Sequence, residues 1–347
     1  MGGHRATGKK YSRERSIHSP ALQQDRFAHQ SHAGMMLGAG MVILYSPRCL
    51  DYAATGHPES PERVRSAVAQ LHRDFHTWIT PTSCTDEDVL RVHTREMLDA
   101  VRTGAFEDAD TPFFPEIYEI AKLSAGAAIL AAEHALAGRP AFSLMRPPGH
   151  HAEHNRIMGF CYFNNIAIAV AKVLQIRNPK PSPRDMRNKS ETRNRRVAIL
   201  DFDCHHGNGT ENIFRDDKRI LFASVHQSPC YPDTGLMSDT NSLNFPLAPG
   251  TKPEEFLAVL DKAIQGIREF RPHLLAVSAG FDSYKDDPIT HMGLEIDTFH
   301  EIGRRIAEFT QPQKTGSSLP CFAVLEGGYS RDFARCVEAF VEGWERR

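Results

Sequence analysis

Polar side chains that could bind a metal or move a proton directly follow an apolar run in "ILDFDCHHGNGTENIF", residues 199–214. They are Asp201, Asp203, His205 and His206. In an extended segment, residues two apart share a face, so Asp201, Asp203 and His205 should point the same way. Burying unpaired charges costs several kcal/mol each. This stretch therefore needs a compensating partner, which could be a metal ion, a proton-transfer chain or a salt-bridge network.

The spacing of Asp203 and His205 would let both side chains bind one metal ion. Asp282 ends another apolar run, "LLAVSAGFD", and could supply a third ligand from a neighbouring strand. Two carboxylate oxygens and one imidazole nitrogen, with a position left open, suit a catalytic zinc ion better than a closed structural site. A buried Asp–His network without a metal is the alternative interpretation of this stretch.

Two adjacent histidines, His150 and His151, follow the apolar run 141–145 in "RPPGHH". Two carboxylate ligands leave a metal ion less electrophilic than three neutral histidines would, so an attacking water should need a base. Either histidine could be that base, and Asp201 is a candidate to orient the ring. A structural role for the histidine pair is the alternative.

Tyr329 follows two glycines, Gly327 and Gly328, in "LEGGY" at the end of a further apolar run. The glycines would let the backbone approach a metal site closely, and the phenol could then point at a substrate carbonyl. A hydroxyl in that position would stabilise an oxyanion that develops on that carbonyl.

Short apolar runs alternate with stretches of helical periodicity along the chain. The predicted strands are 41–46, 141–145, 197–203, 220–226, 274–280 and 321–325. The predicted helices are 61–75, 117–137, 164–176, 253–270, 297–310 and 331–345. Strands that are apolar on both faces and alternate with helices indicate an α/β protein, with a parallel sheet covered on both faces. Ligands of such sheets bind beyond the carboxyl ends of the strands, where these polar residues fall.

Composition bounds the classes of function. The chain has 347 residues, of which 41% are hydrophobic and 24% charged, and a net charge of −2. This near-neutral charge gives no electrostatic reason to expect nucleic acid or an anionic membrane as a partner. No apolar run reaches the ~18 residues of a membrane span. The seven cysteines are scattered, with no CxxC pair, which favours free thiols in a reducing cytoplasm.

We expect a single domain over residues 41–347. Residues 1–40 lack sustained periodicity and are predicted to be a disordered N-terminal extension. The segment "AGMMLGAGMVILY" (33–45), which overlaps the end of this extension, imitates a signal peptide, but no convincing cleavage site follows it. Residues 177–196 carry eight basic and two acidic residues and are predicted to be a basic surface insertion, with a docking patch for an acidic partner as the alternative.

Taken together, these motifs identify a family. From about Met41 to Phe340, the chain resembles the zinc-dependent histone deacetylase and acetylpolyamine amidohydrolase family. The similar segments are "HPESPERV", "RPPGHHAEHNRIMGFCYFNN", "ILDFDCHHGNGT", "SVHQSPCYPDTG", "SAGFDSYKDDP" and "LEGGYS", in the family's order. The resemblance implies the arginase–deacetylase fold, with an eight-stranded parallel sheet between helices. It also implies zinc-dependent hydrolysis of N-acetyl amides, in acetyl-lysine or acetylated polyamines, to a free amine and acetate.

The resemblance also implies roles for individual residues of the reaction centre. His151 matches the family's general base, and His150 matches the partner histidine that Asp201 holds. Asn208 stands behind the second histidine, where the main eukaryotic class has an aspartate, as in class II and bacterial members. Tyr329 matches the tyrosine that polarises the acetyl carbonyl. The zinc ligands, one ion per chain, would be Asp203, His205 and Asp282.

The substrate tunnel and a second cation site follow from the same resemblance. The matching tunnel walls are Gly159, Phe160 and Tyr231, and Asp110 matches the acidic rim residue. Arg63 would line an inner exit for acetate, and Asp233 replaces a usual glycine of the entrance loop. A potassium ion would be held by the backbone around Asp201, Asp203 and His205 together with Ser224 and Val225.

Two other functions compete with deacetylation. A binuclear manganese ureohydrolase of the same fold needs further ligands, DxHxD and a later DxD, but Gly207 and Tyr284 stand at the required places. A non-catalytic acyl-lysine reader would be expected to lack Tyr329 or a metal ligand, and all are present. The substrate, small molecule or protein, and the oligomeric state, monomer or homo-oligomer, stay open. Ile289 stands where the family's polyamine-selective eukaryotic branch has a glutamate, which predicts broad activity.

Overall fold

Eight parallel strands form one sheet in the described parts of the chain, in the order β2-β1-β3-β8-β7-β4-β5-β6. The strands are β1 (Val42–Leu44), β2 (Thr77–Ile79), β3 (Ala141–Ser143), β4 (Val197–Asp201), β5 (Ile220–Gln227), β6 (Ser242–Leu247), β7 (Leu274–Ala279) and β8 (Cys321–Leu325). The computed structural model describes residues 1–2, 40–175, 195–312 and 317–345. Residues 38–347 form one compact unit.

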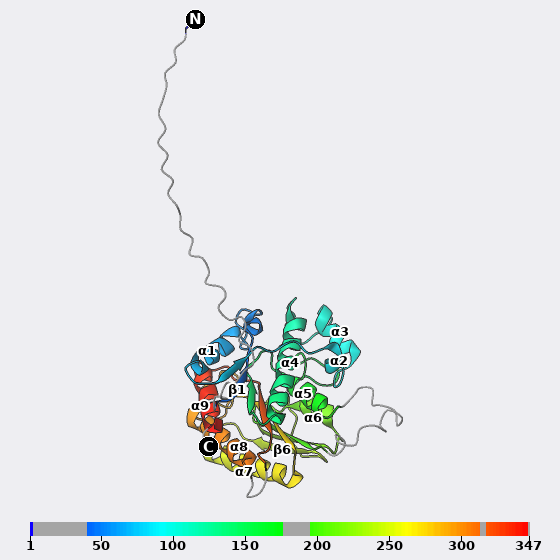
Figure 1. The fold of residues 1–347 in the computed structure, drawn as a ribbon, viewed down its shortest axis with the longest axis vertical. Helices are drawn as coiled ribbons and strands as arrows, with labels where there is room; N and C mark the ends of the chain where they lie inside the picture. Colours follow the sequence, from blue (N-terminus) through cyan, green and yellow to red (C-terminus); the bar gives the residue numbers. More distant parts are fainter. Residues whose placement is uncertain (3–39, 176–194, 313–316, 346–347) are drawn as a thin grey trace, which may run out of the picture. The chain divides into compact units, whose positions relative to one another are not determined.

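The helices pack in two groups around this sheet (Figure 1). One group holds α4, α5 and α6, and the other holds α1, α7, α8 and α9. The helices are α1 (Pro61–Leu71), α2 (Asp86–Val89), α3 (Arg95–Thr103), α4 (Ile117–Leu136), α5 (Asn165–Val173), α6 (Asn208–Phe214), α7 (Pro253–Phe270), α8 (Ile296–Thr310) and α9 (Phe333–Glu345), with a short 3-10 helix η1 (Pro47–Leu50). The predicted eight-stranded, helix-covered parallel sheet is therefore confirmed.

Burial explains why the central strands were predictable. Every residue of β4, β7 and β8 is buried, as expected for strands of a parallel sheet with both faces covered. Local signals set several helix starts. The Asn164 side chain caps α5 by accepting a hydrogen bond from the Ala167 backbone N–H at 3.0 Å, and Pro253 opens α7.

All six predicted strands and all six predicted helices occur, with ends that differ by a few residues. Two edge strands, β2 and β6, and the short helices α2, α3 and α6 were not predicted. The strand β2 has only three residues, all half-buried, and β6 contains Asn244 and Pro246. Neither segment has the continuous apolar pattern that marks the buried strands.

Strand register brings polar residues together at one edge of the sheet. Asp201 at the end of β4 pairs with Ser224 of β5 on one side and with Ser278 of β7 on the other. The loops that follow β3, β4, β7 and β8 start from this same edge and carry the predicted reactive residues.

Two predicted segments fall almost wholly outside the described residues. They are the N-terminal extension, 1–40, and the basic insertion, 177–196. Among the helices that are described, none is both long and apolar enough to cross a bilayer.

Candidate active site

Three buried side chains from the loops after β4 and β7 converge at the carboxyl edge of the sheet. They are Asp203, His205 and Asp282, and one ligand-type atom of each lies within 4.8 Å of the others. His205 Nδ1 lies 2.9 Å from Asp282 Oδ2 and 3.2 Å from Asp203 Oδ1. Within the described ranges, no other set of three His, Cys, Asp or Glu side chains comes together in this way.

Backbone N–H groups orient both carboxylates toward His205. The Gly327 N–H donates to Asp203 Oδ2 at 2.7 Å, and the Cys204 N–H donates to Asp282 Oδ1 at 2.8 Å. The remaining oxygens, Asp203 Oδ1 and Asp282 Oδ2, therefore face the imidazole nitrogen. Outer hydrogen bonds of this kind fix the ligands of metal sites. Two carboxylate oxygens and one imidazole nitrogen fit a divalent ion of the zinc class.

Glycines leave the space that this arrangement needs. A Cβ atom on Gly280 would overlap the Asp203 carboxylate, and one on Gly327 would overlap the carboxylates of both Asp203 and Asp282. Any other residue at either position would displace the carboxylates.

Burial and mutual repulsion disfavour the ionised forms of these two carboxyl groups, so a nearby cation would stabilise them. Burial raises the pKa of Asp282, and the neighbouring Asp203 raises it further. Burial acts on Asp203 in the same sense, but His150 and His205 outweigh it and lower the pKa of that carboxyl. Two buried carboxylates this close stay ionised together only when positive charge lies beside them.

The tandem histidines have different partners and different charge. His150 Nδ1–H donates to Asp201 Oδ2 at 3.0 Å, whereas His151 Nδ1–H donates to Asn208 Oδ1 at 2.8 Å. Burial lowers the pKa of His150, but the charges of Asp203 and Asp201 outweigh this effect and raise the pKa to about 10. Burial, followed by the charges of His150 and His205, holds the pKa of His151 well below its usual value. His151 is therefore neutral, with a free lone pair on Nε2, as a general base requires.

A buried glutamate that the sequence analysis missed supports the histidine loop. Glu326 Oε2 accepts hydrogen bonds from the backbone N–H groups of Gly149 at 2.7 Å and His150 at 3.1 Å. Its Oε1 accepts from the Ser278 hydroxyl at 3.0 Å, and burial raises the pKa of Glu326 to about 7. Glu326 stands within the quoted "LEGGY", but its spacing gave no sign of a contact with a distant backbone.

Tyr329 is held from its backbone and from one face of its ring. Its N–H donates to Asp287 Oδ2 at 2.7 Å, and the Arg63 guanidinium lies 4.6 Å from the ring centre. Arg63 also donates to the carbonyl oxygens of Glu326 and Gly328, each at 2.6 Å. Burial raises the pKa of the Tyr329 phenol well above its usual value, so the hydroxyl stays protonated as a donor. Neither Asp287 nor the backbone contacts of Arg63 were predicted.

A cavity of about 350 Å³ opens above these residues. Its lining includes all four predicted substrate-binding residues, Gly159, Phe160, Tyr231 and Asp110, together with His150, His151, His205 and Tyr329. The ring centres of Phe160 and Tyr329 are 5.7 Å apart, and those of Tyr231 and His151 are 5.2 Å apart. Aromatic walls therefore lead down to His151 and to the Asp203–His205–Asp282 cluster.

The rim of this cavity is fixed by contacts that the sequence did not reveal. His57 Nε2–H donates to the Asp110 carbonyl at 3.1 Å, and the His57 ring packs edge-on against Phe160 at 4.7 Å. The Phe160 N–H donates to Thr111 Oγ1 at 2.9 Å. Phe160 has a positive φ of 68°, which these contacts hold.

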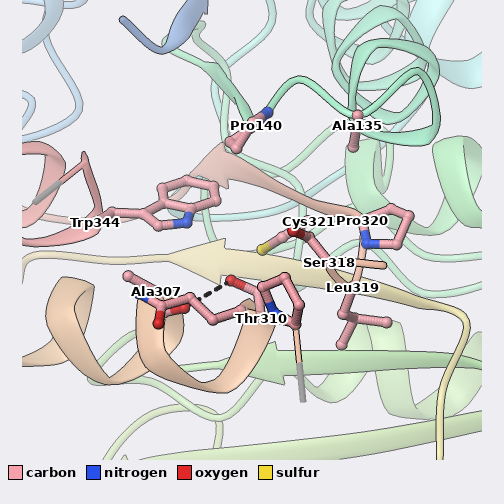
Figure 2. A pocket seen from close by; sticks show the side chains of 12 residues that line it. Ala135, Pro140, Ala307, Thr310, Ser318, Leu319, Pro320, Cys321 and Trp344 are labelled. Carbon is pink, nitrogen blue, oxygen red and sulfur yellow. Dashed lines mark hydrogen bonds between the residues drawn. The ribbon is translucent and has the colours of Figure 1, made fainter. Parts of the chain in front are cut away.

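A second cavity of about 360 Å³ lies among the ends of α4, α8 and α9 and the starts of β3 and β8 (Figure 2). Trp344, Leu319, Pro140 and Thr310 lie around it (Figure 2). No Asp, Glu, His, Lys or Arg is among its described lining residues. The two cavities are nearly equal in size, so the chemistry of the lining selects the first as the candidate active site.

The predicted potassium-site residues are neighbours in the sheet. Asp201 and Ser224 face each other across β4 and β5, and Val225 follows directly. Asp201 Oδ1 accepts from the Asp203 N–H at 3.1 Å, and Ser224 Oγ lies 2.9 Å from His226 Nδ1. Burial raises the pKa of Asp201 to about 6. A potassium ion at this place stays a prediction.

Comparison with known proteins now assigns the family. Residues 57–344 match the histone deacetylase domain. The chain belongs to the histone deacetylase family. A probable deacetylase of Methanothermobacter thermautotrophicus is 37% identical and covers 87% of this chain and 90% of its own length. A histone deacetylase-like amidohydrolase of Pseudomonas aeruginosa is also 37% identical, over 84% of this chain and 77% of its own length.

The fold agrees with the family. The crystal structure of an acetylpolyamine aminohydrolase from Burkholderia pseudomallei aligns with a TM-score of 0.71 and 26% identity, covering 88% of this chain and 98% of that one. This family member is therefore a hydrolase of the deacetylase type with the arginase–deacetylase fold.

Proposed function

We propose that the protein is a zinc-dependent deacetylase that hydrolyses N-acetyl amides of linear amines, in acetyl-lysine or acetylated polyamines, to a free amine and acetate. One observation carries the proposal. The Asp203–His205–Asp282 cluster, a neutral His151 and the Tyr329 phenol meet around the cavity with the aromatic walls.

Each side chain has a distinct task in this mechanism. A divalent ion held by Asp203, His205 and Asp282 would supply Lewis-acid polarisation of the acetyl carbonyl and of the attacking water. His151 Nε2 accepts the proton of that water as it attacks. Tyr329 donates its hydroxyl proton in a hydrogen bond to the oxygen that becomes negative. When the C–N bond breaks, the proton taken by His151 goes to the departing amine nitrogen.

The cavity walls support a linear alkyl chain as the substrate. Phe160 and Tyr231 offer apolar ring surface that can contact any methylene chain. These rings do not discriminate between the groups at the far end of such a chain. Asp110 lies exposed at the rim, where it can accept hydrogen bonds from a substrate backbone or from a cationic amine. We infer that this tunnel takes both classes of acetylated amine.

The proposal extends to a second cation and to location. A potassium ion held near Asp201, Ser224 and Val225 would keep the buried Asp201 ionised beside His150. All seven cysteines are unpaired in the structure, which supports a reducing cytoplasm as the location.

The test measures acetate release and metal content on one protein sample. The substrates are acetylputrescine, acetylspermidine and an acetyl-lysine peptide, with arginine as the control for urea release. We expect acetate from the amides, no urea, one zinc-class ion per chain, and loss of activity in a strong chelator that zinc restores. The variant Asp282→Asn should lose both the ion and the activity. Two tightly bound transition metals per chain, or activity that survives the chelator, would overturn the proposal.

A further inference from the structure

The partner of the proposed base can hydrogen-bond in two opposite ways. An asparagine amide has one oxygen that accepts and one NH₂ group that donates, so Asn208 could do either toward His151 Nδ1. A carboxylate at that place could only accept. The two amide orientations select opposite tautomers of the imidazole.

Hydrogen-bond acceptors around Asn208 determine the orientation of its side-chain amide in the structure. Asn208 Nδ2 lies 2.8 Å from Glu153 Oε1 and 3.4 Å from Met158 Sδ, and neither of these atoms has a hydrogen to donate when Glu153 is ionised. Asn208 Oδ1 is thereby turned to His151 Nδ1, at 2.8 Å. Glu153 lies in the quoted motif "HHAEHN", and the proposed reaction gives it no task.

We propose that Glu153 is a positioning residue that sets the tautomer of His151 through Asn208. The inference rests on the proposed role of His151 as the base. With Asn208 Oδ1 accepting from Nδ1–H, the lone pair of His151 is on Nε2, the atom that takes the proton of the attacking water. With the amide reversed, Nε2 would carry a hydrogen and could not accept one.

The backbone of Glu153 is held independently of its side chain. Its N–H donates to the Arg156 carbonyl at 3.0 Å, and its carbonyl accepts from His93 Nδ1–H at 2.9 Å. The side chain itself is only half-buried. Substitutions that keep this backbone should therefore leave the loop in place.

Four variants distinguish an effect on the tautomer of His151 from an effect on the folding of the protein. Glu153→Ala removes the acceptor, and we expect kcat to fall roughly 10-fold or more with little change in KM. Asn208→Asp alone places two carboxylates at hydrogen-bonding distance, so we expect it to lose activity as well. Glu153→Gln leaves two amides that can turn either way, and should give an intermediate loss.

The exchange variant Glu153→Gln/Asn208→Asp is the decisive one. The new glutamine amide can donate to the new carboxylate, which can only accept from His151 Nδ1–H. We expect this double variant to recover most of the kcat lost in Asn208→Asp alone. Metal content is measured on each variant, because loss of the ion together with activity in Glu153→Ala would overturn the positioning role.

A spectroscopic readout keeps the test independent of turnover. In ¹⁵N-histidine NMR of the metal-loaded enzyme, His151 should be protonated on Nδ1 in the wild type and in the exchange variant. Glu153→Ala should show both tautomers. An unchanged tautomer and a kcat within twofold in Glu153→Ala, or an exchange variant that stays inactive although folded and metal-loaded, would overturn the inference. A wild type with this tautomer and no deacetylase activity would instead overturn the proposed function.

Discussion

At the scale of single residues, the tandem histidines show how partners decide function. His150 and His151 are chemically identical and both are buried, yet only His150 faces carboxylates on two sides. Those charges favour its cationic form, whereas His151 faces an amide and two other imidazoles and stays neutral. Adjacent positions in the chain thus provide one cationic and one neutral imidazole, and the neutral one is the base that we propose.

The phenol of Tyr329 offers a direct test at this scale. Tyr329→Phe removes one hydrogen-bond donor to the oxyanion, so we expect kcat to fall about 100- to 1,000-fold with KM little changed. The ring should stay in place, because Asp287 holds its backbone and Arg63 packs on its face. Steady-state kinetics on an acetyl-lysine peptide, with metal content as the control, checks this. A kcat within a few-fold of wild type would refute the assigned role.

The sequence predicts the residues within a reactive motif better than the residues of other loops that hold the motif in place. The approach of Asp203, His205 and Asp282 to one another was predictable, because their types and their places after apolar strands are typical of metal ligands. Glu326, Asp287 and Glu153 act on backbone N–H groups or on a second polar side chain in another loop. Such contacts depend on how distant loops meet, which spacing along the chain does not encode.

At the scale of elements, burial on both faces made the interior of the sheet predictable. The strands β4, β7 and β8 lie in the middle of the sheet and read as continuous apolar runs. The edge strands β2 and β6 each have one neighbour. All of β2 and half of β6 are incompletely buried, and neither strand has a comparable apolar run. The pairing of β2 with β1 and of β6 with β5 depends on contacts with the rest of the sheet, which the local sequence does not show.

His93, in the loop between α2 and α3, links these helices to the active-site loops in a way that depends on pH. Its Nδ1–H donates to the Glu153 carbonyl, and its Nε2 accepts from the Asn164 N–H, each at 2.9 Å. Burial lowers the pKa of His93 to about 3. Because the unfolded chain takes up this proton first, the stability should be complete above pH 6.5 and be lost as pH falls toward 3.

The expected loss is about 2 kcal/mol at pH 5, from about 1.4 kcal/mol per pH unit below 6.5. Urea unfolding of wild type and His93→Gln at pH 7 and pH 5 measures it. The variant starts lower in stability but should lose about 2 kcal/mol less between the two pH values, since other groups titrate in both proteins. Parallel losses would show that His93 does not carry this dependence.

At the scale of the whole molecule, the reactive side chains described above gather where the strands of the sheet end. The two cavities have similar volumes. Among their described lining residues, histidines and an aspartate occur in the cavity at the carboxyl ends of the strands and not in the other. The wall of that cavity is aromatic, and its rim carries the exposed side chains of Asp110 and Ile289. Discrimination between substrates of equal chain length must therefore come from the rim.

Acetylpolyamines and acetyl-lysine differ at this rim, because the former bring cationic amines and the latter a neutral backbone. We expect wild-type kcat/KM values for acetylputrescine and an acetyl-lysine peptide to lie within about 100-fold, a gap under ~3 kcal/mol. Ile289→Glu adds a carboxylate at the mouth of the cavity. It should shift the preference toward the cationic substrate by about 1–2 kcal/mol at low salt, and by less as salt screens the charge.

The matched control is Ile289→Gln, which has the same length without the charge and should leave the ratio of the two kcat/KM values close to that of wild type. Both variants are measured at two ionic strengths, because only a charge effect should weaken as salt rises. A wild-type preference for acetylputrescine above a thousandfold would contradict the broad tunnel. It would mean that Asp110, or another acidic side chain of the rim, already selects the cationic amine.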